Sequence, residues 1–131
     1  HSFPTRRSSD LSAGVSGIML SHIRYEKIDP VWPASLSVEI GKRMLRDRMD
    51  FDGLVMTDDL DMGAIAKHFD IETAITRIFA AGIDMALICH ESPKIEKAFK
   101  ILLTLVAAGD DNRKKASDSV QRILKTKSRY L

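Results

Sequence analysis

The hydrophobic runs of the chain fall into three similar units. Each run begins at a glycine, continues as a mostly apolar stretch of about a strand's length, and ends in ionisable residues. The runs begin at Gly17, Gly53 and Gly82, which are 36 and 29 residues apart. That spacing is the size of a βα unit. Strands that helices cover on both faces are typically continuous apolar runs, so we expect one strand in each unit.

Apolar residues at helical spacing follow or separate these runs. The pattern predicts helices over residues 37–49, 72–81, 93–108 and about 116–131. Gly82 directly after the second helix is a typical C′ stop. Strands that alternate with helices imply a parallel sheet in an α/β fold. Three strands cannot close a barrel, so the chain is either a small open sheet or part of a (β/α)8 barrel.

Composition adds little to this picture. The 131 residues are 44% hydrophobic and 29% charged, with a net charge of +2, which is ordinary for one globular domain. So small a charge excess argues against nucleic acid as a partner, and no apolar run approaches the roughly 20 residues of a membrane span. The single cysteine, Cys89, closes an apolar run and is expected to be buried. Residues 1–11 have no periodicity and are expected to be a disordered, non-native leader, which leaves 12–131 as the domain.

A group of carboxylates follows the second run. Asp58, Asp59 and Asp61 come directly after it, and α/β folds place their chemistry just past the carboxyl ends of such strands. The acids are therefore candidates for an acid, a base, a nucleophile or a metal ligand. The structural alternative is that Asp61 caps the next helix with help from its neighbours. Strand alternation puts Met56 and Asp58 on one face, but it does not choose between Asp58 and Asp59.

Several segments resemble the family 3 glycoside hydrolases. They are Gly-Ile-Met-Leu-Ser-His-Ile at 17–23, Asp-Pro-Val-Trp-Pro-Ala-Ser-Leu-Ser at 29–37, and Phe-Asp-Gly-Leu-Val-Met-Thr-Asp-Asp-Leu-Asp-Met-Gly-Ala at 51–64. The likeness continues through 81–90 and 119–130. It is strongest to the bacterial β-N-acetylhexosaminidase branch, because the glucosidase branch has a tryptophan after its acid.

The resemblance implies a fold and a reaction. The family's catalytic domain is a TIM-type barrel, and this chain is similar to its last three βα units, with strands at about 17–21, 53–57 and 84–89. The family pattern assigns Asp58 as the nucleophile of a retaining hydrolase, which forms a covalent glycosyl-aspartate that water then opens. The implied partner is a carbohydrate, a cell-wall-derived glycan with a terminal N-acetylglucosamine. The branch is often cytoplasmic, which is the expectation here.

The resemblance also suggests the surroundings of the nucleophile. His22 matches a position near the sugar site, although a packed, hydrogen-bonded histidine is the alternative. Met19, Asp59 and His90 are the other residues expected to line the substrate site, whereas His68 is expected at the surface. No histidine pair lies at ligand spacing and no glycine-rich phosphate loop occurs, so neither a metal nor an organic cofactor is predicted.

The family's proton donor does not occur among these residues. In this branch it is a histidine on a loop after the fifth strand, and the sugar-binding Lys-His pair also precedes the segment seen here. The loss of general acid catalysis typically costs about 10²–10⁴ in rate. We therefore expect the 131-residue chain alone to be inactive.

Three other interpretations remain open. A receiver-like signalling domain also has an acidic pair after a strand, which binds Mg²⁺ beside a phosphoacceptor aspartate. Other β-glycosidases of the same family share most of the motifs. Finally, the chain could be a non-enzymatic piece that self-associates through an exposed strand edge and uncovered apolar faces.

Overall fold

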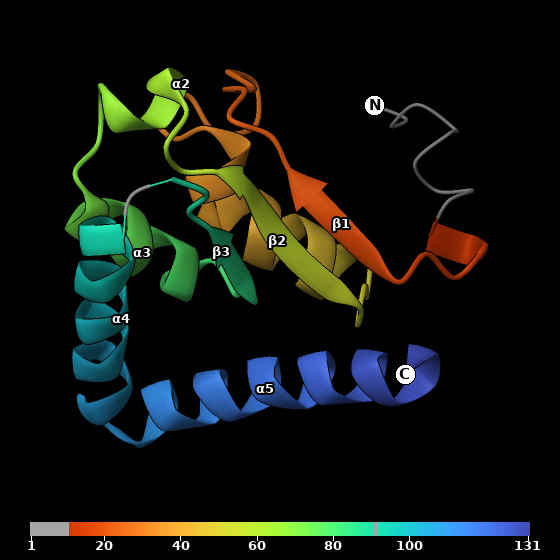
Figure 1. Cartoon of the computed structure of the whole chain (residues 1–131). Helices are drawn as coiled ribbons and strands as arrows, with labels where there is room; N and C mark the ends of the chain where they lie inside the picture. The colour runs from red at the N-terminus through yellow and green to blue at the C-terminus, as the bar shows by residue number, and fades with distance from the viewer. Residues whose placement is uncertain (1–10, 91) are drawn as a thin grey trace.

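The computed structural model describes residues 11–90 and 92–131, which form a three-stranded sheet with helices (Figure 1). The elements in chain order are β1 (Gly17–Leu20), η1 (Ala34–Leu36), η2 (Glu39–Arg48), β2 (Leu54–Asp59), α2 (Gly63–Ala66), α3 (Ile71–Ala80), β3 (Met85–Leu87), α4 (Ser92–Ala107) and α5 (Asp110–Tyr130). None of the helices in the described part of the chain combines the length and the apolar character of a membrane span. Residues 1–10 lie outside the described residues, so the disordered leader stays a prediction.

The sheet is parallel throughout, in the order β1-β2-β3. Gly17 lies opposite Leu54, and Met56 lies opposite Met85. This confirms the parallel α/β arrangement expected from the repeating units. Gly53 is required where β2 begins, because a Cβ at this position would lie 2.8 Å from the Ser16 carbonyl oxygen.

The third strand is shorter than predicted, because side chains replace its ladder partners. The expected range was 84–89, whereas β3 spans Met85–Leu87. The Leu87 N–H donates to the Thr57 hydroxyl at 3.1 Å, and the Cys89 N–H donates to the Asp59 carboxylate at 3.1 Å. The chain therefore leaves the regular ladder at Leu87 but stays attached to the end of β2.

The two faces of the sheet differ in their cover. Helices η2 and α3 lie behind the sheet, and α5 runs below it (Figure 1). Val55 and Thr57 are fully buried. On the other face Met19 and Met85 are 53% and 37% exposed, and both lie opposite Met56 in the strand register. A row of three methionines therefore crosses the open face.

The predicted helices are present, with different ends. Helix α3 begins after Asp70, whose carboxylate accepts the Thr73 N–H at 2.7 Å, and it ends before Gly82, whose φ is +67°. The C′ stop predicted at Gly82 is thus confirmed. Helix α5 begins six residues earlier than expected, directly after Gly109. The short elements η1 and α2 were not predicted, because a single turn carries little periodicity.

The amino ends of β2 and β3 meet at a buried carboxylate, that of Asp84, whose side chain is 0% exposed. Its Oδ2 accepts the Arg46 guanidinium at 2.7 Å and the Val55 N–H at 3.0 Å. Its Oδ1 accepts the Ser119 hydroxyl at 2.6 Å and Arg122 Nε at 3.0 Å. One side chain therefore joins η2, both strands and α5. Both carboxylate oxygens thus have two donors each, as a buried charge requires.

A second buried carboxylate organises the segment between β1 and η2. Asp29 is 5% exposed, and it accepts the N–H groups of Val31 and Trp32 and the Ser37 hydroxyl. Burial by itself raises the pKa of the Asp29 carboxyl. The Ser37 hydroxyl and the two N–H groups, with help from the charge of Arg77, outweigh burial and hold the pKa below the ordinary 3.8.

Replacing Asp84 by alanine should destabilise the fold strongly. The substitution leaves two partly buried guanidinium groups without their counter-ion, and we expect the free energy of unfolding to fall by about 3 kcal/mol in urea denaturation. Asp110→Ala is the matched control, because the Asp110 side chain is 96% exposed, and it should change stability by less than about 1 kcal/mol. Equal effects of the two substitutions would contradict the central role of Asp84.

The Asp29 carboxyl should make stability depend on pH below 4. Its pKa is lower in the folded state, so its stabilising contribution is present above the unfolded value of 3.8 and is lost as pH falls through the folded value. Asp29→Asn removes this titration. We therefore expect the Tm of the wild-type chain to fall more steeply than that of the variant below about pH 4. Parallel Tm curves would contradict the assignment.

Candidate active site

The carboxyl ends of the three strands bring ionisable side chains together. His22 follows β1, and His90 follows β3. Between them, Asp58 and Asp59 end β2. The His22 Nε2 atom lies 2.7 Å from the Asp59 carbonyl oxygen, and the His90 Nε2 atom lies 3.8 Å from Asp59 Oδ2. The four ionisable residues that the sequence suggested therefore lie at one edge of the sheet.

The two neighbouring aspartates have different surroundings. The half-buried Asp58 carboxylate accepts one hydrogen bond within the described part of the chain, from the Asp59 N–H to Oδ1 at 2.8 Å. Its Oδ2 is therefore available to a ligand. The Asp59 carboxylate instead accepts the N–H groups of Asp61 and Cys89, both at 3.1 Å. Strand alternation could not separate the two residues, whereas their hydrogen-bond partners do.

These backbone donors keep Asp59 ionised. The Asp61 N–H is the main cause that lowers the pKa of the Asp59 carboxyl, and the Cys89 N–H adds to it against the opposing effects of burial and of the Asp61 charge. Asp59 therefore holds the ends of β2 and β3 together as a charged acceptor. These hydrogen bonds suit a structural role for Asp59 better than the role of a nucleophile, which must form and break a covalent bond to substrate.

His22 is enclosed by hydrogen bonds. Its Nδ1 lies 2.7 Å from the Ser35 hydroxyl, and its Nε2 lies 2.7 Å from the Asp59 carbonyl oxygen. Ser35 is fully buried. This geometry corresponds to the packed, hydrogen-bonded alternative, so a direct contact between His22 and a sugar stays a prediction.

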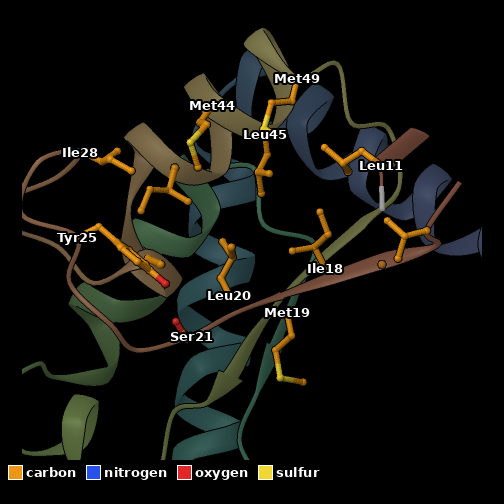
Figure 2. Close-up of a pocket in the computed structure, with 14 residues that line it drawn as sticks. Leu11, Ile18, Met19, Leu20, Ser21, Tyr25, Ile28, Met44, Leu45 and Met49 are labelled. Atoms are coloured by element: carbon orange, nitrogen blue, oxygen red, sulfur yellow. The ribbon is translucent and has the colours of Figure 1, made fainter. Parts of the chain in front are cut away.

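Met19 lies on the face of the sheet that strand alternation assigns to Asp58. Figure 2 shows its side chain pointing away from those of Ile18 and Leu20, which face η2. Through the register with Met56 it belongs to the open face. Met19 therefore forms part of the apolar surface on the same face as Asp58. A contact between Met19 and substrate stays a prediction.

Beyond β3, an ion pair joins the loops that carry the site. Asp61 Oδ2 accepts the His90 N–H at 2.9 Å, and Asp61 Oδ1 accepts Lys94 Nζ at the start of α4. The Asp61 and Lys94 side chains are only 8% and 21% exposed. The interpretation of Asp61 as a helix cap was wrong, because α2 follows Met62 and no side chain caps it. The side chain of His90 is 77% exposed.

Two further sequence expectations have clear outcomes. Cys89 is exposed rather than buried, because the Asp59 carboxylate draws its backbone out of the strand. His68 is exposed, as expected. Sequence reasoning missed Ser35, Thr57 and Lys94, whose partners lie 13 to 33 residues away and leave no local signal.

An apolar cavity of about 360 Å³ lies beside β1, toward η2 (Figure 2). Its lining includes Ile18, Leu20, Met44 and Leu45, and none of the described residues that line it is a carboxylate, a histidine, a lysine or an arginine. Among the residues that the structure describes, no three acids, histidines or cysteines are grouped to hold a metal ion. This cavity therefore differs from the strand ends, where His22, Asp58, Asp59 and His90 gather.

Comparison with known proteins gives a consistent result. The model of the glycosyl hydrolase family 3 N-terminal domain matches residues 7–126. A β-hexosaminidase from Nitrosomonas eutropha is 34% identical over 110 residues, covering 84% of this chain and 31% of the relative. One from Hydrogenovibrio crunogenus is 35% identical over 78 residues, 60% of this chain and 22% of the relative. The chain thus spans about a quarter of the length of the curated relatives it matches.

Solved structures agree with the sequence relatives. The family 3 β-N-acetylglucosaminidase from Paenibacillus sp. superposes with a TM-score of 0.88 at 30% identity, over 94% of this chain and 24% of that protein. The β-N-acetylhexosaminidase from Beutenbergia cavernae superposes with a TM-score of 0.83 at 28% identity, over 93% of this chain and 36% of that protein.

Proposed function

The chain belongs to the glycosyl hydrolase family 3 N-terminal domain family, and from this premise we propose that it carries the nucleophile of a retaining β-N-acetylhexosaminidase. Its three βα units are the last three of a (β/α)8 barrel, with the strand ends facing the sugar. The parallel sheet and the superpositions on family members support this architecture. A cytoplasmic location stays a prediction.

The observation that carries the proposal is the difference between the two adjacent aspartates. The Asp59 carboxylate is occupied by two backbone N–H groups. Asp58 has one oxygen oriented by the Asp59 N–H and one oxygen open, above the exposed face of the sheet. A nucleophilic carboxylate needs this combination of a fixed orientation and an available lone pair. The family pattern selects the same residue.

The reaction then follows from the position of Asp58. One carboxylate oxygen attacks the anomeric carbon of the sugar as the bond to the leaving oxygen breaks, and the leaving oxygen takes a proton from a general acid. Water then attacks the same carbon and releases the Asp58 carboxylate. The general acid is expected outside these 131 residues, in agreement with the resemblance.

The names of the relatives support N-acetylglucosamine as the sugar, because those compared above are β-hexosaminidases and a β-N-acetylglucosaminidase. We propose glycans derived from the cell wall as the source of that sugar. Other β-glycosidases of the family are the nearer alternative. The receiver-like interpretation loses its support, since the family match extends over residues 7–126.

A chimera tests the nucleophile. Residues 13–126 of this chain would replace the matching segment of the Paenibacillus enzyme, which supplies the rest of that protein. We expect the chimera to hydrolyse an aryl N-acetyl-β-glucosaminide, and we expect Asp58→Asn to lower kcat by at least about 10³-fold. The Asp58→Gly variant would be incubated with azide and a dinitrophenyl glycoside, whose leaving group needs no protonation. Azide should then take the place of the carboxylate, and the product should be the α-glycosyl azide. The isolated 131-residue chain should give no turnover.

The control is Asp111→Asn, an exposed residue at the start of α5, which should leave kcat unchanged. Full activity of Asp58→Asn, or an azide product from Asp59→Gly in place of Asp58→Gly, would contradict the assignment of the nucleophile.

A second candidate property, self-association, is favoured by the exposed apolar residues of α4. Ile95, Phe99 and Leu103 are 46%, 60% and 53% exposed. In addition, β1 and β3 each pair on one side only within the described sheet. Unpaired strand edges and contiguous apolar surface both promote association of protein chains.

Sedimentation of the 131-residue chain over a wide range of concentrations should therefore show a rising average mass. Phe99→Lys combined with Leu103→Lys should reduce the association by introducing charge into the apolar surface. Thr104→Lys, on an exposed polar position of the same helix, is the control and should have little effect. A single monomeric species at all concentrations would contradict self-association.

A further inference from the structure

Asp59, which follows the candidate nucleophile, is tied to both neighbouring strands. On the β1 side, the Asp59 carbonyl oxygen accepts a hydrogen bond from His22 Nε2 at 2.7 Å. On the β3 side, the Asp59 carboxylate accepts the Cys89 N–H at 3.1 Å. Between these ties, the Asp59 N–H donates to Asp58 Oδ1 at 2.8 Å. The orientation of the Asp58 carboxylate thus depends on how firmly Asp59 is held.

The contacts of His22 define its hydrogen-bonding roles. A carbonyl oxygen can only accept, so His22 Nε2 must carry the hydrogen. In the neutral ring Nδ1 is then the acceptor, and the Ser35 hydroxyl donates to it. Ser35 is fully buried, and its own N–H donates to the Ser21 carbonyl oxygen at 3.0 Å. A buried serine on η1 therefore holds the ring from behind.

We propose that His22 is a positioning residue for the nucleophile, a role that rests on the proposed function of Asp58. The chain of contacts runs from Ser35 through the His22 ring to the Asp59 carbonyl, and from the Asp59 N–H to the Asp58 carboxylate. By its bond to the Asp59 carbonyl, His22 fixes the backbone of Asp59, and the Asp59 N–H in turn keeps one Asp58 oxygen in place. The other oxygen then faces the open side of the sheet.

A direct sugar contact by His22 fits these contacts less well. Both ring nitrogens already have partners at 2.7 Å, and a sugar hydroxyl would have to displace one of them. Displacing Nε2 would leave the Asp59 carbonyl without its donor, which is unfavourable in a half-buried site. The two roles predict different kinetics, because a sugar ligand chiefly affects KM whereas a misplaced nucleophile lowers kcat.

Two substitutions of His22 separate its two nitrogens. The side-chain amide of glutamine reaches the position of Nε2, and that of asparagine reaches the position of Nδ1. In the 131-residue chain, we expect His22→Asn to speed hydrogen exchange at the Asp59 amide by about tenfold relative to the Val55 amide, as for the loss of one hydrogen bond. His22→Gln should restore the wild-type ratio. The Val55 amide, near the other end of β2, reports on the stability of the whole fold.

The same pair of variants in the chimera tests the consequence for catalysis. His22→Asn should lower kcat by roughly 10- to 100-fold with little change in KM, and His22→Gln should recover most of kcat. An increase in KM that is equal in both variants would overturn the proposal in favour of a sugar ligand. Unchanged exchange ratios in both variants would also overturn it.

The outcomes distinguish this proposal from the proposed function. Asp58→Asn could retain activity while the exchange ratio still changes in His22→Asn. In that case Asp58 is not the nucleophile, and His22 cannot position it, although the contact of His22 with Asp59 is real. If Asp58→Asn is inactive and the exchange ratio does not change, only the role of His22 fails.

Discussion

The buried carboxylate of Asp84 is the interaction on which the arrangement of this chain depends. It lies where the amino ends of β2 and β3 meet, and it accepts two guanidinium groups, a hydroxyl and a backbone N–H. Arg46 continues from it to the carbonyl oxygens of Phe51 and Gly53. Since these groups belong to η2, both strands and α5, one charge determines how four elements meet. The alignment of β2 with β3 depends on the hydrogen bond between Asp84 and the Val55 N–H.

The two ends of the sheet use carboxylates in different ways. At the amino end the charge is neutralised by arginines and fully enclosed, which favours rigidity. At the carboxyl end Asp59 is stabilised by neutral N–H groups, and Asp58 has one such donor among the residues that the structure describes. The carboxylate bound by two arginines therefore lies at the amino end of the sheet, and the carboxylate available for chemistry lies at the carboxyl end. Parallel α/β proteins commonly separate stability and function in this way.

Much of the fold could be predicted because its signals are local. Glycine-led apolar runs indicated three parallel strands, and Gly82 indicated a helix stop. The site was predicted in location but not in detail. Asp84 is a single acid within an apolar run, and nothing nearby in the sequence indicates its partners 29 to 38 residues away. The same limit applies to Cys89 and Asp61, whose environments are decided by side chains from other units. His22 was recognised through resemblance, whereas its partner on η1 was not.

The methionine row on the open face gives the surface below Asp58 an unusual chemical character. Met19, Met56 and Met85 lie at one level across the three strands, so thioethers rather than branched aliphatic groups make up this part of the sheet. Thioether side chains are flexible and polarizable, and they adjust their shape to whatever rests on them. Among apolar side chains they are also easily oxidised, and conversion to sulfoxides would make this apolar surface polar. Exposure to peroxide would therefore change the polarity of the surface next to Asp58 without modifying the Asp58 carboxylate.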